Sequence, residues 1–314
     1  MNLLISGVIA ASIGLTPFAA HAQDATGTLK KIRERGTIVL GVRDFSAPFS
    51  YLDDKQSYQG YSVDLCMRIV SAVQKKLGLS TLNVTLNPVT AATRIPLMAN
   101  GTIDLECGNT TNNVERQGQV DFAPTMFITS NRLLSKKTSN IRSLADMKGK
   151  AIVASSGTSH LKQLTALNVD QKLDLNIMTV KDTAEGFLMI ETGRGVAYSM
   201  DDIILANLVA NAKNPNDFAI TTEPLSVEPF GIMMRKNDPA FKKVVDDAVI
   251  GIFQSGEINR IYDKWFLRPI PPKGINLNWP MTAELKAIIA KPTNSGDPAA
   301  YAVVPETQKR LINK

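Results

Sequence analysis

Apolar and polar positions alternate in blocks along the chain, and these blocks predict strands and helices in turn. Residues 37–42 are mostly apolar and β-branched, as in a buried strand. Over residues 61–73 the apolar positions recur at spacings of three and four, which predicts a helix packed on a core. Further strands are predicted at 82–86 and 103–107, with a short helix at 94–99 between them. This order is typical of a parallel sheet with helices on its faces.

The same alternation returns downstream. The further elements that the pattern predicts are strands at 151–154, 175–180 and 196–200, helices at 183–191 and 203–212, a strand at 231–234, and helices at 239–253, 258–265 and 281–289. Residues after Lys291 are rich in Pro, Asn, Ser, Gly and Asp, which predicts a poorly ordered tail. The 314 residues favour about two domains, in agreement with separate α/β sets.

The N-terminal segment has the pattern of a secretory signal. Residues 2–20 carry no charge, and an apolar run at 3–15 precedes a small-residue site that ends at Ala22. We therefore expect residues 1–22 to be a signal peptide that is removed on export. An uncleaved anchor is the less favoured alternative, because a membrane span needs about 20 apolar residues. The sequence thus predicts an exported, periplasmic protein.

Composition and charge narrow the class of protein. Hydrophobic residues make up 44% and charged residues 20% of the chain, which excludes disorder for most of it. The net charge of +6 is spread among acidic neighbours, so nucleic acid is not an expected partner. Cys66 and Cys107 are the two cysteines; a disulfide and two buried free thiols are equally favoured. Two distant thiols do not make a metal site, and no nucleotide fingerprint occurs, so we expect neither metal nor cofactor.

Short motifs follow one another in a fixed order. They are GVRD at 41–44, APFSY at 47–51, GYSVDL at 60–65, RIPL at 94–97, NGTID at 100–104, CGNTTNNVER at 107–116, LADMKGK at 144–150, SGT at 156–158, SMDD at 199–202 and IYDKWF at 261–266. Together they resemble the periplasmic amino-acid-binding proteins of ABC transporters, solute-binding protein family 3, and most of all the glutamate/aspartate-binding branch. The resemblance extends over about residues 29–285.

The resemblance implies an α/β fold, the type II periplasmic-binding-protein clamshell. Each of its two lobes is a mixed, mainly parallel sheet flanked by helices, and two hinge strands join the lobes. The implied segments are the signal peptide at 1–22, the first part of lobe 1 at 23–127, lobe 2 at 128–227, the return to lobe 1 at 228–275, and a C-terminal tail with a helix at 276–314. A small-molecule amino acid is expected between the lobes, and the monomeric protein would pass it to an ABC transporter permease.

The resemblance also implies which residues hold the two charged ends of an amino acid. Arg116 and Thr111 are expected to bind the α-carboxylate, for which a planar guanidinium is a good partner. Thr158 lies in a turn before a helix that the sequence predicts from His160 onward, and it is expected to close on the same carboxylate. Asp201 is expected to take the ammonium, and the neighbouring Asp202 is the alternative, favoured more as a helix cap. Taken alone, Arg116 would be assigned to a solvated surface beside Glu115.

A glutamate or aspartate ligand adds a second carboxylate, and Arg43 and Arg94 match the side-chain clamp of that branch. Three positions depart from the branch: Thr183 replaces a His, and Ala91 and Asn109 each replace a Ser. Asn109 and Thr183 are still expected to be ligand-binding residues. Each hydrogen bond lost to a charge costs roughly 1.5–3 kcal/mol unless water replaces it. Glutamate or aspartate is the first choice of ligand, and another dicarboxylate or an amino-acid derivative is the alternative.

Catalysis is a second class to weigh, because the fold also hosts periplasmic dehydratases. Without the signal peptide, His160 is the one histidine, and a lone histidine is more often a surface or satisfied residue than a catalyst. The carboxylates that would serve as an acid–base pair are Glu106, Glu115, Asp201 and Glu228. No nucleophile elbow or metalloprotease motif occurs, so binding is favoured and no catalytic residue is expected. A sensory binding protein is a third class that the sequence does not separate from transport.

Overall fold

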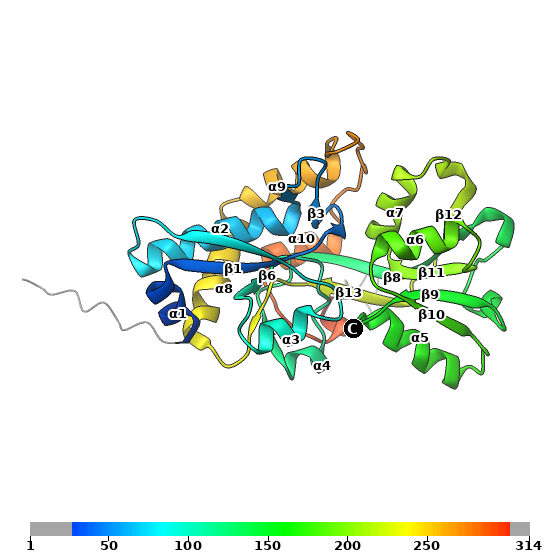
Figure 1. Ribbon diagram of the computed structural model, residues 1–314, viewed down its shortest axis with the longest axis horizontal. Helices are drawn as coiled ribbons and strands as arrows, with labels where there is room; N and C mark the ends of the chain where they lie inside the picture. Colours follow the sequence, from blue (N-terminus) through cyan, green and yellow to red (C-terminus); the bar gives the residue numbers. More distant parts are fainter. Residues whose placement is uncertain (1–26, 302–314) are drawn as a thin grey trace, which may run out of the picture.

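The computed structural model describes residues 27–301, so the expected signal peptide at 1–22 lies outside the described part. Two α/β lobes lie side by side, and two strands, β8 and β13, run between them (Figure 1). Among residues 27–301, none of the helices has the length and hydropathy that a bilayer span requires.

The sheet of the first lobe has the strand order β5-β1-β6-β14-β7. Strand β1 (Thr37–Val42) pairs in parallel with β5 (Asn83–Pro88) and β6 (Leu105–Glu106). Strand β14 (Met233–Arg235) follows the second lobe in the sequence and pairs antiparallel with β6 and β7 (Val120–Phe122). The return of β14 completes a mixed sheet from two distant parts of the sequence.

Helices and a small hairpin sheet surround this first sheet. The helices are α1 (Gly27–Arg35), α2 (Tyr61–Leu77), α3 (Arg94–Ala99), α4 (Val114–Gln117), α8 (Pro239–Gln254), α9 (Glu257–Tyr262), the π-helical η4 (Asp263–Leu267) and α10 (Ala283–Ala290). The hairpin strands are β2 (Phe45–Ser46), β3 (Ser50–Leu52) and β4 (Tyr58–Gln59). The hydrophobic pattern did not predict this hairpin sheet, because strands of two or three residues carry too few alternations.

The second lobe is built on the strand order β10-β9-β11-β8-β12, with β13 also paired to β8. Its strands are β8 (Phe127–Lys136), β9 (Ala151–Ser155), β10 (Asn176–Val180), β11 (Ala197–Asp201), β12 (Phe218–Ile220) and β13 (Ser226–Phe230). Its helices are α5 (Ser159–Asp170), α6 (Thr183–Glu191) and α7 (Asp202–Asn211), and the 3-10 turns of the chain are η1 (Lys137–Ser139), η2 (Ala145–Met147), η3 (Pro215–Asp217) and η5 (Pro298–Tyr301). Strands β9, β10 and β11 are parallel, so their carboxyl ends meet at one edge.

The two strands that run between the lobes are anchored in an aromatic cluster. β8 and β13 pair antiparallel, from Asn131 with Ser226 to Phe127 with Phe230. The ring of Phe49 lies edge-on to Phe127 at 4.9 Å and to Phe230 at 5.2 Å between centroids. Edge-to-face pairs of this kind add about 0.5–1.5 kcal/mol beyond their buried area. The aromatic cluster therefore packs around the start of β8 and the end of β13, which are the first-lobe ends of the two connections.

A disulfide joins Cys66 in α2 to Cys107, directly after β6. Of the two alternatives left open by the sequence, the structure supports the bridge. The bond ties a core helix to the segment that begins the Thr-rich turn at 108–113. It therefore holds the base of the loop on which several predicted ligand residues lie.

Replacing both cysteines with alanine is expected to lower the free energy of unfolding by about 4 kcal/mol, because the bridge closes a loop with a sequence separation of 41. Urea unfolding of the exported chain, followed by circular dichroism, measures this loss. Reduction of the wild-type protein should reproduce it. A loss below about 1 kcal/mol would contradict a stabilising role for the bridge.

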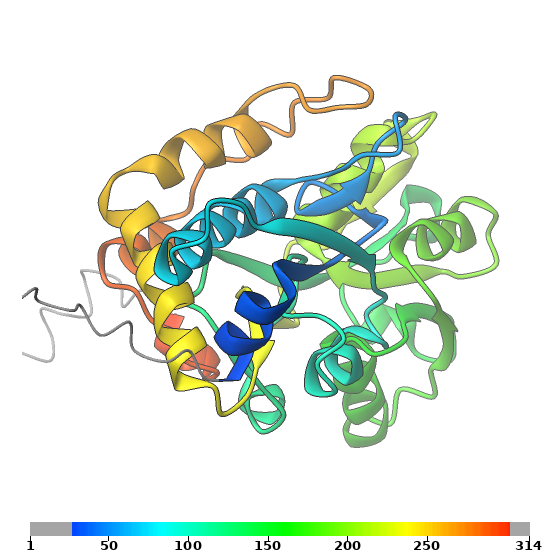
Figure 2. The same ribbon diagram turned by 60° about the vertical axis from the view of Figure 1, so that its left-hand side comes forward.

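The C-terminal segment 292–301 corrects the expectation of a poorly ordered tail. The N–H of Thr125 donates to the carbonyl of Thr293 at 2.8 Å, and the hydroxyls of Thr125 and Tyr301 are 2.8 Å apart. Ahead of this segment, α10 packs along α8 (Figure 2). Hydrogen bonds to a distant part of the chain fix this irregular segment, and local composition does not reveal such partners.

Candidate functional site

A narrow cavity lies between the lobes, where loops at the ends of β1, β9 and β11 meet. Seven of the eight ligand residues expected from the sequence line it, and these are Arg43, Arg94, Asn109, Thr111, Thr158, Thr183 and Asp201. The cavity is completed by Ala91, Ser155, Ser159, His160 and Met200. The structure therefore brings together residues more than 150 positions apart in the sequence.

The lobes are in direct contact around this cavity. Gly157 has a φ of +75°, and a Cβ at that position would lie 2.5 Å from the Cα of Ala92 in the opposite lobe. Only glycine combines this left-handed conformation with so close an approach of two backbones. The hydroxyl of Thr183 donates to the carbonyl of Phe45 across the same gap. The arrangement is that of a closed cleft.

Two buried guanidinium groups occupy the first-lobe wall of the cavity. Arg43 is 6% exposed and donates from Nη1 to Asn109 Oδ1 at 3.4 Å. Arg94 is 3% exposed, and its Nε has no hydrogen-bond partner among the described residues. Burial, followed by the positive charges of Arg116 and Arg43, lowers the pKa of Arg94 well below its usual value. Two cations in a dry site need anionic partners, and the buried carboxylate of Glu106 acts on both of them.

Arg116 lies beside the cavity and lines an adjoining groove with Thr111 and Thr158. Its Nη1 donates to the Thr111 carbonyl at 2.9 Å, and its Nη2 donates to the Gly157 carbonyl of the other lobe at 3.3 Å. Burial lowers the pKa of Arg116. The alternative of a solvated partner for Glu115 is wrong, since Glu115 pairs with Lys162 and Arg116 is 6% exposed.

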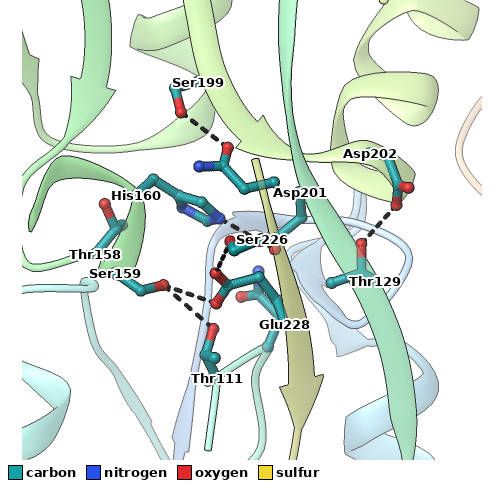
Figure 3. A network of polar contacts seen from close by, with 12 residues as sticks. Thr111, Thr129, Thr158, Ser159, His160, Ser199, Asp201, Asp202, Ser226 and Glu228 are labelled. Atoms are coloured by element: carbon teal, nitrogen blue, oxygen red, sulfur yellow. Dashed lines mark hydrogen bonds and ion pairs between the residues drawn. The ribbon is translucent and has the colours of Figure 1, made fainter. Parts of the chain in front are cut away.

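Asp201 ends β11 and is 1% exposed, so its carboxylate faces the cavity without solvent. Burial raises the pKa of this carboxyl group, and the nearby His160 opposes that shift. Asp202 has other partners: it accepts from Thr129 at 2.6 Å (Figure 3). It also accepts from Arg132 at 3.2 Å. Asp202 therefore points to a separate groove, and Asp201 is the acid of this site.

Thr158 is the N-cap of α5, accepting from the N–H of Leu161 at 3.2 Å. Such a side-chain cap satisfies one of the N–H groups that the start of a helix leaves without a partner. The same hydroxyl donates to the Ser155 carbonyl at 2.6 Å. Because the hydroxyl is already used, the free N–H groups of the first turn of α5 are the donors that this turn offers to an anion.

His160 is the functional residue that the sequence reasoning missed. It is 2% exposed rather than on the surface, and its Nε2 lies 3.2 Å from Asp201 Oδ1 (Figure 3). Its Nδ1 is buried without a hydrogen-bond partner in the described part of the chain, so the residue is only half satisfied. Its position in the first turn after the Ser-Gly-Thr loop was the one available signal, since such a turn faces the strand ends.

Metal chemistry has no support in the described part of the chain. Within residues 27–301 no group of three His, Cys, Asp or Glu side chains is placed to hold a metal ion. Of the carboxylates weighed as an acid–base pair, Glu115 is exposed and paired with Lys162. What the cavity offers is guanidinium donors on the first-lobe wall and the carboxylate of Asp201 on the second-lobe wall, which suits a zwitterion with a second carboxylate.

The amino-acid sequence was compared with protein families and with characterised proteins. The family of bacterial extracellular solute-binding proteins, family 3, matches residues 38–268. The chain is 52% identical over 292 residues to the L-glutamate/L-aspartate-binding protein of Pseudomonas aeruginosa, covering 93% of this chain and 96% of that protein. It is 46% identical over 286 residues to the glutamate/aspartate import solute-binding protein of Salmonella typhimurium, covering 90% of this chain and 95% of that protein.

Solved structures agree with the sequence comparison. An ancestral arginine-binding protein bound to arginine has a TM-score of 0.67 and 26% identity, covering 74% of this chain and 99% of that protein. The expected two-lobe fold, type II of the periplasmic binding proteins, is confirmed, and so is the resemblance drawn from the motifs. The chain belongs to the bacterial extracellular solute-binding proteins of family 3.

Proposed function

We propose that this protein binds glutamate or aspartate between its lobes and delivers it to the membrane permease of an ABC transporter. The observation that carries the proposal is the pair Arg43 and Arg94, both buried on the wall of a cavity that Asp201 also lines. A neutral amino acid would offer no acceptor to the guanidinium donors that face the cavity, and the Nε of Arg94 has none among the described residues. The second carboxylate of an acidic amino acid provides that acceptor.

The two ends of the ligand are assigned by charge and position. Arg116, Thr111 and the first turn of α5 with Thr158 receive the α-carboxylate, and Asp201 receives the ammonium. Arg43 and Arg94 receive the side-chain carboxylate, with Asn109 holding Arg43 in place through the contact at 3.4 Å. The names of the glutamate/aspartate-binding relatives support an acidic amino acid as the ligand.

Capture then proceeds by closure of the clamshell. In the open form the ligand meets the first-lobe residues, among them Arg94 and Arg116. Closure adds Thr158 and Asp201 from the second lobe, and it is favoured only by contacts that exist in the closed state. A micromolar dissociation constant corresponds to about −8 kcal/mol, which a few desolvated charge pairs can supply.

The remaining features of the proposal concern location and organisation. A signal peptide at 1–22 would direct the protein to the periplasm. Lobe 1 would be built from 23–127 and 228–275, and lobe 2 from 128–227. The monomer would carry the amino acid as its only small-molecule ligand, without cofactor, and without a catalytic step.

A thermal-shift panel on ligand-free protein tests the function. Glutamate and aspartate at about 100 times the dissociation constant should stabilise the protein by about 2.7 kcal/mol, which raises its melting temperature by about 5 °C or more. Neutral amino acids should give little shift. Dicarboxylates without an amino group should also give little shift, because Asp201 would then be left without its partner.

Each other outcome of the panel has a definite meaning. A shift with a larger acidic derivative but not with glutamate or aspartate would mean that Thr183 and Ala91 have changed the shape of the pocket. A shift with neutral amino acids alone would contradict the roles given to Arg43 and Arg94. No shift with any acid would contradict the proposed function.

A further inference from the structure

The buried charged groups around the cavity balance one another only while no ligand is present. Three are positive and three are negative, each 6% exposed or less: Arg43, Arg94, Arg116, Glu106, Asp201 and Glu228. Glutamate or aspartate brings two carboxylates and one ammonium, and hence a net charge of −1. Because an uncompensated charge in a dry site is costly, binding requires a further positive charge.

His160 is the titratable group placed to supply that charge. It lies in the first turn of α5, lines the cavity and is 2% exposed. One ring nitrogen, Nε2, is 3.2 Å from Asp201 Oδ1, while Nδ1 has no partner in the described part of the chain. A protonated imidazole has two N–H donors, so the second donor needs an acceptor that the protein itself does not provide.

We propose that capture of glutamate or aspartate takes up one proton from solution, and that His160 holds it. In the bound state Nε2–H donates to Asp201, and Nδ1–H donates to a carboxylate oxygen of the ligand. The resemblance implies a histidine at position 183, where this chain has Thr183, and His160 would supply an imidazole from α5 instead. This inference rests on the function proposed above.

The groups that face His160 from the surrounding elements favour its protonated form. Asp201 on β11 and Glu228 on β13 are negative, and Arg116 on α4 is positive. Burial lowers the pKa of His160, but the charge of Asp201, its hydrogen bond and the charge of Glu228 together outweigh burial and raise it. Glu228 is itself held by the hydroxyl of Ser159 at 2.9 Å.

The sign of the pH dependence follows from linkage. A ligand with net negative charge raises the pKa of His160 further, so the bound state keeps its proton to a higher pH than the free state. Affinity is therefore full below the pKa of the free protein. As pH rises between the two pKa values, the dissociation constant increases by up to about tenfold per pH unit.

Calorimetry and NMR together test the proposal. The chain from residue 23 onward, with a tag that contains no histidine, has His160 as its one histidine. Titration with L-glutamate in two buffers of different ionisation enthalpy measures the protons taken up. Imidazole nitrogen NMR of the same protein reports the charge of His160 directly. We expect uptake close to one proton midway between the two pKa values, and an imidazolium signal in the bound state.

Two variants of α5 separate the histidine from its surroundings. His160→Gln keeps a side chain that can hydrogen-bond but not the charge, so proton uptake should vanish and glutamate affinity at low pH should fall about tenfold or more. Lys162→Gln removes an exposed positive charge from the same helix, and its proton uptake should equal that of the wild type. NMR of the wild type answers the question even if His160→Gln fails to fold.

Two results would overturn this inference and leave the proposed function in place. Glutamate binding with no net proton uptake would do so, as would uptake that persists in His160→Gln, which would assign the proton to Asp201. In both cases glutamate still binds, so the proposed function stands. Failure of the wild type to bind any acidic amino acid would overturn the proposed function and this inference with it.

Discussion

Replacement of Arg94 by methionine is expected to make the ligand-free protein more stable and to weaken its binding of glutamate and aspartate at least about thirtyfold. The guanidinium is buried with an unpartnered Nε, and burial together with Arg116 and Arg43 lowers its pKa. Methionine fills a similar space without a charge, and removal of a poorly compensated buried ion stabilises by about 1–4 kcal/mol. Loss of a desolvated partner of the side-chain carboxylate costs about 2–5 kcal/mol of binding, at least a thirtyfold weaker dissociation constant.

Urea unfolding and calorimetric titration measure the two effects on one sample. Arg68→Met is the matched control, because Arg68 is half-exposed on α2 and pairs with Glu257 on the surface. That control should change stability by no more than about 1 kcal/mol and leave the affinity for glutamate as it was. Unchanged glutamate affinity in Arg94→Met would show that the side-chain clamp is wrongly assigned.

The sequence predicted the elements whose pattern is long and regular. The strand expected at 37–42 is β1 with the same bounds, and the helix expected at 239–253 is α8, which ends one residue later. The hairpin strands β2, β3 and β4 have two or three residues each, and no periodicity develops over so short a distance. The segment 292–301 was mistaken for a poorly ordered tail because its partners lie in the first lobe.

The residues of the site can also be separated into those that the sequence predicted and those that it did not. The resemblance supplied seven residues that line one cavity, although hydrophobic periodicity alone would not have joined Arg43 to Asp201. His160 was missed because a single histidine forms no motif. His160 is buried because β11 and β13 pack against α5 in the folded chain. One of its ring nitrogens then lies near Asp201 at the end of β11, which the sequence alone does not reveal. Individual departures from a family pattern therefore need the structure before their effect can be judged.

Replacement of Arg116 by alanine is expected to abolish detectable binding of every α-amino acid, acidic or neutral. Its guanidinium donates to the carbonyls of Thr111 in the first lobe and Gly157 in the second. It is also the group proposed to bind the α-carboxylate that all these ligands share. Removing it leaves that carboxylate and Glu228 without a cation, which costs about 2–5 kcal/mol or more. Calorimetric titration with glutamate, aspartate and glutamine measures the loss.

Arg116→Lys distinguishes the two roles of this side chain. Lysine keeps the charge beside Glu228 but not the planar fork, so the lobes should still be electrostatically balanced while bidentate recognition is lost. We expect its binding to be weak for all three ligands, at a melting temperature close to that of the wild type. If Arg116→Ala instead weakened only the acidic ligands, Arg116 would belong with Arg43 and Arg94 to the side-chain clamp. The α-carboxylate would then rest on Thr111 and the first turn of α5, whose N–H groups would have to hold it without a cation.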